Sequence, residues 1–269
     1  MKLKKRIIFT LLFCKNYFYL SRNFRLQKIG DLEWLKCNYN FNNVSFYVDE
    51  LIILNVSRDS SNVLDFCEVV KDISQEIFVP LSVGGGINNM EDVSNLFASG
   101  ADKIVLNTNL YDNTDIASKI CSLYGKQCVV ASLDIKKEKG SYYLYSKFGS
   151  QNQGDLNILF GNQNIVKNVG EFYINSINND GTGNGLDLEL AELISSKINT
   201  PFIMAGGIGK SEHILNALSK NYIHGVSTAH LLNFIGDSLQ KCREEAYIKE
   251  INLAKWMHLK DFKKSHTRN

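Results

Sequence analysis

Short apolar runs alternate along the chain with longer amphipathic segments. The apolar runs are RIIFTLLF, ELIILNV, FVPLSV and KIVLNT in the first half, and CVVASLDI, EFYINSI, PFIMAG and HGVSTA in the second. Unbroken runs of this kind are typical of strands that are buried on both faces. After Met90, by contrast, Val93, Leu96 and Phe97 recur at helical spacing while Asp92 falls on the other face. The pattern predicts eight strands separated by helices, which is an α/β fold.

Two segments of the chain repeat one another. PLSVGGGINNMEDVSNLF begins at Pro80 and PFIMAGGIGKSEHILNAL begins at Pro201, which lies 121 positions later, as Glu171 lies after Glu50. A constant spacing across separate elements indicates two similar halves. Eight strands with intervening helices fit a doubly wound sheet or a closed (β/α)8 TIM barrel. The duplication favours a barrel built from two similar half-barrels, because closure leaves no exposed sheet edge.

Composition and charge narrow the possible functions. Apolar residues make up 44% of the 269 residues, and the formal net charge is +2 with no basic stripe, so nucleic acid is not an expected partner. The six cysteines form no C-x-x-C pair, and no G-x-G-x-x-G turn follows the first strand, so we expect no metal and no cofactor. The N-terminal apolar run is too short to span a bilayer and lacks a small-x-small cleavage site, which indicates a cytoplasmic protein without a membrane partner. We expect residues 1–250 to form one barrel domain and residues 251–269 a basic tail.

Glycine pairs follow two corresponding strands. In a barrel, GGG and AGG lie at the carboxyl ends of the third and seventh strands, where the backbone can approach a ligand and a helix N-terminus favours an anion. LNTNL and STAHL follow the next strand in each half, and NNDGTG follows the sixth strand. The glycines alone could be tight turns, but their occurrence at two matching places favours a pair of phosphate sites. Two such sites suit a long ligand with a phosphate at each end.

The insertion KKEKGSYYLYSKFGSQNQG after the fifth strand is expected to form a small hairpin, and Asp134 ends that strand in VVASLDIKK. A carboxylate removed from water there would have a raised pKa, which suits a general acid or base. It could instead pair with Lys136 or cap the loop, and the residues alone leave these alternatives open.

The motifs RII, DELI, VGGGI, GADK, NT, SLDIKK, DGT and GG-GK-EH occur in this order. From about Lys5 to about Leu232 the chain resembles the cyclase subunit of imidazole glycerol phosphate synthase. The resemblance implies a (β/α)8 barrel that forms a heterodimer with a glutaminase subunit. In that family, ammonia passes through the barrel to a phosphorylated small-molecule substrate, a bis-phosphorylated ribonucleotide, at the opposite mouth.

The resemblance also implies roles for individual residues. Asp134 matches one of the two catalytic aspartates, and Asp102 matches a residue that faces the glutaminase. The charged ring implied to gate ammonia could equally be a stabilising network, since the lower end of a barrel usually serves stability. The gate residues are Arg6, Glu50, Lys103 and Glu171. One phosphate site consists of Gly85, Gly86, Asn107 and Thr108, and the other consists of Asp180, Gly181, Thr182, Gly206, Gly207, Ala229 and His230. At the position of His230 the family usually has serine.

The first strand departs from the family pattern. Leu12 holds the place of the other catalytic aspartate, Asn55 replaces a second aspartate, and a lysine is lost near Leu20, within an aromatic and basic loop. In these departures the chain is similar to divergent paralogues of the family that serve amidino-sugar and surface-polysaccharide synthesis. Two alternatives remain: an authentic cyclase of histidine biosynthesis that uses Asp134 with another group, or a non-catalytic conduit that activates a glutaminase.

Overall fold

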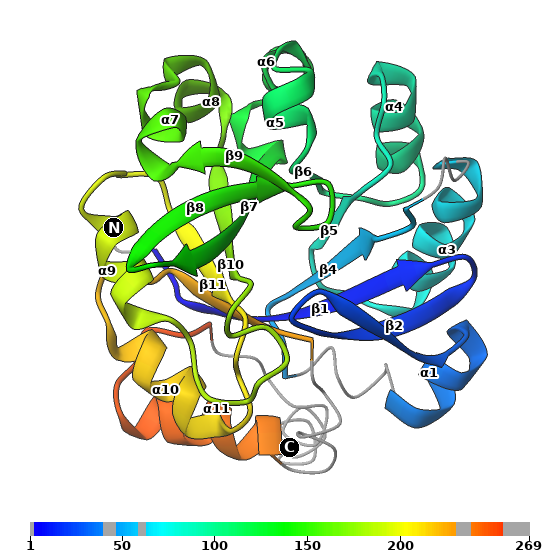
Figure 1. Cartoon of the computed structure of the whole chain (residues 1–269). Helices are drawn as coiled ribbons and strands as arrows, with labels where there is room; N and C mark the ends of the chain where they lie inside the picture. The colour runs from blue at the N-terminus through cyan, green and yellow to red at the C-terminus, as the bar shows by residue number, and fades with distance from the viewer. Residues whose placement is uncertain (1–2, 40–46, 59–62, 230–237, 255–269) are drawn as a thin grey trace, which may run out of the picture.

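The structure is a computed structural model that describes residues 3–39, 47–58, 63–229 and 238–254. Eight parallel strands form a closed barrel, seen nearly end-on in Figure 1. Closure is completed by the pairing of two of them, in which Glu171 lies opposite Val130. The strands of the barrel are β1 (Arg6–Cys14), β4 (Glu50–Asn55), β5 (Leu81–Gly84), β6 (Lys103–Leu106), β7 (Val129–Glu138), β10 (Glu171–Ser176), β11 (Phe202–Ala205) and β12 (Gly225–Thr228). The predicted TIM barrel is therefore confirmed.

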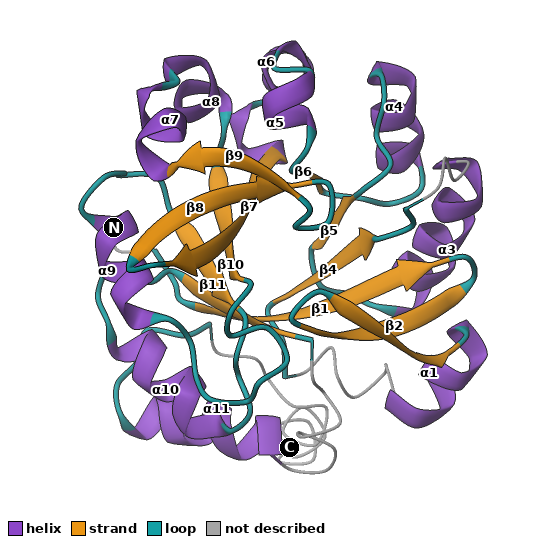
Figure 2. Ribbon diagram, in the orientation of Figure 1, coloured by secondary structure: helices purple, strands orange, loops and turns teal. Residues whose placement is uncertain are grey.

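Helices surround the barrel on its outer side (Figure 2). Asn89 begins one of them with a capping box, because its side chain accepts from the amide of Asp92 while Asp92 accepts from the amide of Asn89. The helices are α1 (Leu32–Tyr39), α3 (Val63–Glu76), α4 (Met90–Ala98), α5 (Asn109–Asp112), α6 (Asp115–Tyr124), α7 (Leu156–Gly161), α8 (Gln163–Asn168), α9 (Leu188–Ser195), α10 (Ser211–Ser219) and α11 (Ser238–Ile248), with a 3₁₀ turn at Lys126–Cys128.

The two halves have corresponding elements. The spacing of 121 that relates Glu50 to Glu171 relates β4 to β10 and β5 to β11 at both of their ends. The first strand of each half, β1 or β7, is followed by two antiparallel strands. These are β2 (Tyr17–Arg22) and β3 (Arg25–Gly30) after β1, and β8 (Ser141–Ser146) and β9 (Gln151–Asp155) after β7.

Only one of these two insertions was predicted. The hairpin expected after the fifth strand is present, whereas the aromatic and basic segment after the first strand, expected as a loop, forms β2 and β3 instead. The chain reverses there through left-handed backbone at Lys15 and Asn16 and again at Asn23 and Phe24. Asn favours this conformation in two-residue hairpin turns, so a second hairpin can form without any glycine.

Alternation along the strands divides the apolar residues into two cores. The larger core lies between the sheet and the helices and includes Phe9, Phe66 and Phe172. A smaller cluster fills the inside of the barrel, where every second side chain points inward. The inner cluster consists of Ile8, Ile52, Val105, Val130, Tyr173, Ile203 and Ala205, with Leu54 packed against it.

The chain after α11 still packs on the barrel. Leu253 is buried and bridges to Lys5 beside the start of β1. Of the tail expected at 251–269, the structure describes residues 251–254, and the remainder lies outside the described residues. Within the part of the chain that the structure describes, no helix has the length and apolar character needed to cross a membrane.

Candidate functional site

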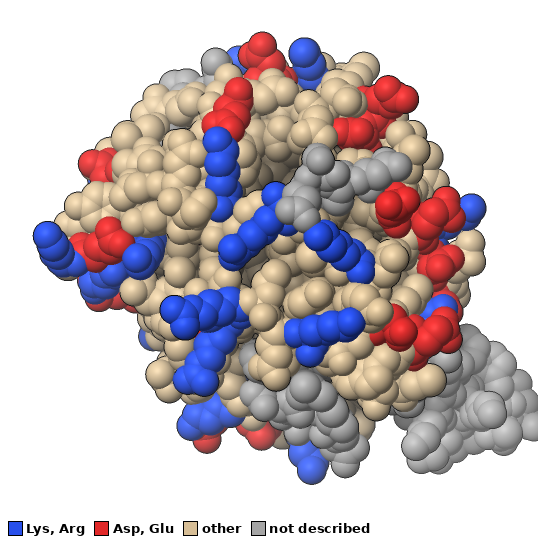
Figure 3. Space-filling model, turned by 45° about the vertical axis from the view of Figure 1, so that its right-hand side comes forward, with Lys and Arg blue, Asp and Glu red and all other residues tan. Residues whose placement is uncertain are grey.

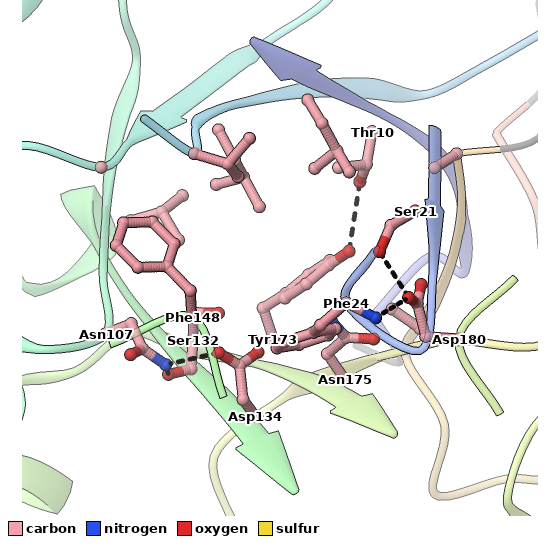
Figure 4. Close-up of a pocket in the computed structure, with 18 of the residues that line it drawn as sticks. Thr10, Ser21, Phe24, Asn107, Ser132, Asp134, Phe148, Tyr173, Asn175 and Asp180 are labelled. Carbon is pink, nitrogen blue, oxygen red and sulfur yellow. Dashed lines mark hydrogen bonds between the residues drawn. The ribbon is translucent and has the colours of Figure 1, made fainter. Parts of the chain in front are cut away.

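A pocket opens at the face where the eight strands end, here called the upper face. Its lining comes from both halves and has apolar parts, such as Leu12 and Leu54, as well as polar ones (Figure 4). Arg58 also lines it. Lys and Arg side chains gather toward the middle of the surface in Figure 3, while acidic ones lie mostly nearer its edges. The site is therefore suited to an anionic ligand that has an uncharged middle.

The two glycine turns, Gly85–Gly86 and Gly206–Gly207, lie at this pocket as predicted from the repeat. All four glycines have φ between 72° and 102°, which is the left-handed region that side chains disfavour. A Cβ on Gly85 would also collide with the backbone oxygen of Asn55. Both turns therefore require glycine and present bare backbone to the pocket.

Most of the other residues expected to bind phosphate also line the pocket. They are Asn107, Thr108, Asp180, Gly181 and Ala229. Thr182 does not line it: its hydroxyl donates to the carbonyl of Asn179 at 2.8 Å and accepts from the amide of Asn184, so it stabilises the turn. His230 lies outside the described residues.

Asp134 lines the pocket, and Asn107 Nδ2 donates to its Oδ2 at 3.2 Å. Burial raises the pKa of Asp134 to about 7, against a hydrogen bond from Asn175 that lowers it. The alternative pairing with Lys136 is not formed, because Lys136 pairs with Glu138 at 2.7 Å. Asp134 can therefore exchange a proton near neutral pH.

No second carboxylate stands opposite Asp134 on the first strand. Leu12 lines the pocket and lies opposite Leu54 on the neighbouring strand, so the inward positions of β1 and β4 at this level are apolar. Asn55 also lines the pocket, and its Oδ1 accepts from the amide of Ser57 at 3.1 Å. The first half of the barrel thus contributes apolar and amide groups where the second half contributes an acid.

Sequence reasoning missed a network of hydroxyl groups in the lining of the pocket. Thr10 Oγ1 and Ser227 Oγ are 2.6 Å apart, and Thr10 Oγ1 and Tyr173 Oη are 3.3 Å apart. Burial raises the pKa of Tyr173 to about 12, so it remains a neutral donor. These residues occupy inward positions of their strands, and marking every second residue of each strand would have found them.

Asp180 holds the β2–β3 turn over the pocket. Its Oδ2 accepts from Ser21 Oγ at 2.5 Å and from the Phe24 amide at 3.0 Å, and its carbonyl accepts from the Asn23 amide (Figure 4). The sequence suggested that this carboxylate faces a ligand. These contacts show that Asp180 also fastens the β2–β3 hairpin of the first half to a loop of the second half.

The four charged residues of the predicted gate meet at the lower end of the barrel. We call Arg6, Glu50, Lys103 and Glu171 the lower charge cluster; each is the first residue of its strand. Arg6 pairs with both glutamates, and Lys103 lies 3.0 Å from Glu50 and 3.3 Å from Glu171. Ser82 Oγ adds a hydrogen bond to Glu50 at 2.6 Å. Each buried carboxylate therefore has two cationic partners.

This pairing sets the charge state of the cluster. Burial alone would raise the pKa of Glu171, but the hydrogen bond and charge of Arg6, followed by those of Lys103, hold it below the ordinary value. Burial opposes charge on Arg6 as well, and the two glutamates raise its pKa. Arg6 and Glu171 are therefore ionised at neutral pH.

Asp102 is exposed at the same lower end, where its carboxylate accepts from the amide of Leu81 at 2.8 Å. It precedes Lys103, so it lies next to the lower charge cluster. Among the residues described by the structure, no group of three or more His, Cys, Asp or Glu side chains could hold a metal ion.

Comparison with known proteins agrees with this architecture. Residues 40–236 match the family model described as histidine biosynthesis protein. The matched residues cover most of the chain and include both glycine turns at the upper face of the (β/α)8 barrel. The chain belongs to the histidine biosynthesis protein family, as a HisF-like cyclase subunit.

Three individual proteins show in more detail what this chain is similar to. A protein of Parasynechococcus marenigrum strain WH8102, provisionally named imidazole glycerol phosphate synthase subunit hisF2, is 43% identical over 94% of both chains. A Campylobacter jejuni protein with the same provisional name is 31% identical over 90% of this chain and 95% of its own. Imidazole glycerol phosphate synthase subunit HisF of Dictyoglomus turgidum is 36% identical over 78% of this chain and 82% of its own.

Proposed function

We propose that this protein is a HisF-like subunit that receives glutamine-derived ammonia from a glutaminase partner and supports its transfer to a phosphorylated substrate. We further propose that it is a divergent paralogue that serves amidino-sugar and surface-polysaccharide synthesis. The two relatives named as hisF2 are similar to it over nearly their whole length, which supports this assignment.

The observation that carries the proposal is the presence of Leu12 in the same pocket as Asp134. Ring closure by two acid–base groups needs a proton donor or acceptor on each side of the substrate, and a leucine side chain is neither. Loss of one such group typically lowers a rate by about 100-fold to 10,000-fold. Both glycine turns nevertheless lie at the pocket, so we expect ligand binding to be retained while cyclisation is impaired.

The interior of the barrel supports a route for ammonia. We propose that neutral ammonia crosses the apolar inner cluster between the lower charge cluster and the pocket, because ammonium would lose its hydration there. The lower charge cluster would then admit ammonia by a small rearrangement of its ion pairs. Arg6 and Lys103 are each about one-fifth exposed, so the cluster is within reach of a partner bound below.

Two other functions each have one supporting observation. An authentic cyclase of histidine biosynthesis is favoured by Asp134, whose pKa of about 7 suits a single residue that both donates and accepts protons. A non-catalytic activator of a glutaminase is favoured by Leu12. The three functions differ in whether the chain alone makes product from ammonium salt and whether it accelerates a glutaminase.

The glutaminase of the same source provides the test. We expect glutamate release from glutamine to be faster when the purified chain is added, and Asp102→Lys to weaken this stimulation by reversing a charge at the lower end. Glu212→Lys is the matched control, because Glu212 is an exposed acid at the start of α10, near the upper face. Equal glutaminase rates with and without the chain would contradict the proposed partnership.

A further inference from the structure

The inward-facing residues of β1 change in character from the lower end of the strand to the upper end. Arg6 belongs to the lower charge cluster, Ile8 to the apolar inner cluster, and Leu12 to the lining of the pocket. Thr10 lies between Ile8 and Leu12 on the same face, because every second side chain of a strand points the same way. A hydroxyl group therefore lies where the apolar interior meets the pocket.

Two further hydroxyl groups meet Thr10 at this level. Tyr173 extends from β10 toward Thr10, with 3.3 Å between Oη and Oγ1 (Figure 4). Ser227 on β12 places its Oγ 2.6 Å from Thr10 Oγ1. We call Thr10, Tyr173 and Ser227 the hydroxyl cluster. All three line the pocket and are at most 4% exposed, so three strands bring buried hydroxyl groups to one place.

The hydroxyl cluster is a polar site in an apolar surround. Inward positions of a barrel are usually filled by branched apolar residues, as at Ile8 and Ile203 here. Burial of a hydroxyl is tolerated when the group is hydrogen-bonded. The contacts inside the cluster meet this need, so its members keep their positions without a ligand. The site is therefore preformed.

The hydroxyl cluster also has spare hydrogen-bonding capacity. Three hydroxyl groups have three protons and six lone pairs, and each contact between two of them uses one proton and one lone pair. Three groups form at most three such contacts, so at least three lone pairs remain. Ammonia donates up to three hydrogen bonds and accepts one, for which a hydroxyl proton can rotate toward it. The remaining groups thus match a small neutral amine.

The surroundings of the hydroxyl cluster disfavour charge. Burial raises the pKa of Tyr173 to about 12, with smaller contributions from Asp134 and Asp180. Within the described residues, neither carboxylate is hydrogen-bonded to the cluster. An ammonium ion would lose its hydration there without an anion in contact, whereas neutral ammonia loses less. The cluster is therefore suited to ammonia in its neutral form.

We propose that Thr10, Tyr173 and Ser227 form a binding site for neutral ammonia at the upper end of the barrel interior. This inference rests on the proposed function, because it takes the interior of the barrel to be the route of ammonia. The site holds ammonia at the pocket that Asp134 also lines, where a phosphorylated substrate would meet it.

Nuclear magnetic resonance of the purified chain, labelled with carbon-13 at tyrosine Cζ, tests the site. The Tyr173 signal is identified by its loss in Tyr173→Phe. We expect ammonium chloride to shift this signal to a saturating value, and potassium chloride, whose cation resembles ammonium in size and charge, to leave it in place. The half-maximal shift should need several times less total ammonium at pH 9 than at pH 8, because more of it is present as ammonia. Asp134, with a pKa of about 7, is ionised at both.

Thr10→Val tests whether the hydroxyl groups themselves bind ammonia. Valine has the shape of threonine without the hydroxyl, so the affinity for ammonia should fall about twofold to tenfold, the effect of one net hydrogen bond. Thr10→Ser keeps the hydroxyl and should keep the affinity. The matched control is the signal of Tyr142, identified with Tyr142→Phe. Its hydroxyl donates to Asp187 outside the pocket, so ammonia should not shift it.

The failing outcomes are distinct. A shift that potassium chloride reproduces, a half-maximal concentration that is the same at pH 8 and pH 9, or an affinity that is unchanged in Thr10→Val would overturn the ammonia site. The proposed function fails separately, when the chain does not accelerate the glutaminase. Stimulation of the glutaminase without an ammonia-specific shift would overturn this inference alone.

Discussion

The two ends of the barrel interior differ in whether their charged side chains have partners of opposite charge. At the lower end, the buried carboxylates of Glu50 and Glu171 are shared between Arg6 and Lys103, which are partly exposed, so the negative charges are compensated. At the upper end, Asp134 has amide neighbours and no salt bridge within the described residues, and burial raises its pKa to about 7.

This difference shows how the two ends of one barrel can suit two different roles, one based on ion pairs and one on proton transfer. Opposite charges in contact favour each other's charged form. Asp134, which is partly buried and has no salt bridge among the described residues, instead changes its protonation state near neutral pH, which is useful for proton transfer. Leu12 and Leu54 add to the contrast, because they line the upper pocket with uncharged side chains.

The largest effect on stability is expected from breaking the lower pairing. Arg6→Met leaves two buried glutamates with Lys103 as their remaining partner in the cluster. Removing one member of a buried ion pair typically costs about 3–5 kcal/mol of unfolding free energy, which urea denaturation would measure. The matched control is Lys210→Met, whose partner Glu212 is exposed and whose loss should cost about 1 kcal/mol or less. Equal losses in the two variants would show that the lower cluster is no more than a surface network.

The next effect concerns the upper end and depends on pH. The folded chain keeps a proton on Asp134 up to about pH 7, whereas the unfolded chain releases it near the ordinary carboxyl pKa of 3.8. Stability therefore falls as the pH rises between these two values, and the loss is complete above about pH 7. Asp134→Asn removes the titration and should raise the unfolding free energy by about 2–4 kcal/mol at pH 8 and by little at pH 4.

Thermal or urea unfolding across this pH range checks the prediction. Asp65→Asn serves as the control, because Asp65 is exposed on α3 and its loss should leave the pH profile unchanged. A gain in Asp134→Asn that is equally large at pH 4 and pH 8 would mean that the mutation acts through packing and not through charge.

A smaller effect is expected where the upper end is closed by the β2–β3 turn. Asp180→Ala removes the acceptor of the Phe24 amide and the Ser21 hydroxyl, which should cost about 1–2 kcal/mol locally. Hydrogen exchange of the Phe24 amide should then become about tenfold faster. Ser21→Ala keeps that amide bond and should change its exchange less. Unchanged exchange in Asp180→Ala would show that the turn does not depend on this carboxylate.

The fold was predictable because its signals are local and repeated. Buried runs such as VVASLDI and a spacing that returns at Glu171 specify strands and their duplication without any knowledge of tertiary contacts. The β2–β3 hairpin was not predicted, because its turn uses Asn23 and Phe24 where a glycine would be the usual signal. Its register is stabilised by contacts with Asp180, which is distant in sequence.

The candidate site was predictable at positions where the backbone conformation requires one particular residue type. Gly85 and Gly206 are needed for left-handed turns, and they lie at the pocket. Thr182 lies outside the pocket lining and its hydroxyl bonds to the turn, because a hydroxyl in a glycine-rich loop can stabilise the turn as well as contact a ligand. Thr10 and Tyr173 carried no motif, and their inward direction follows only from the register of the barrel.

The central claim is that the upper end has kept its phosphate-binding turns and lost a catalytic acid. The most direct measurement is product formation from ammonium salt and the bis-phosphorylated ribonucleotide of the family, with the purified chain and with Leu12→Asp. We predict no detectable imidazole glycerol phosphate from the unchanged chain and a rate at least about 100-fold above its background from Leu12→Asp. Rapid product formation by the unchanged chain, with no further gain in Leu12→Asp, would contradict the account.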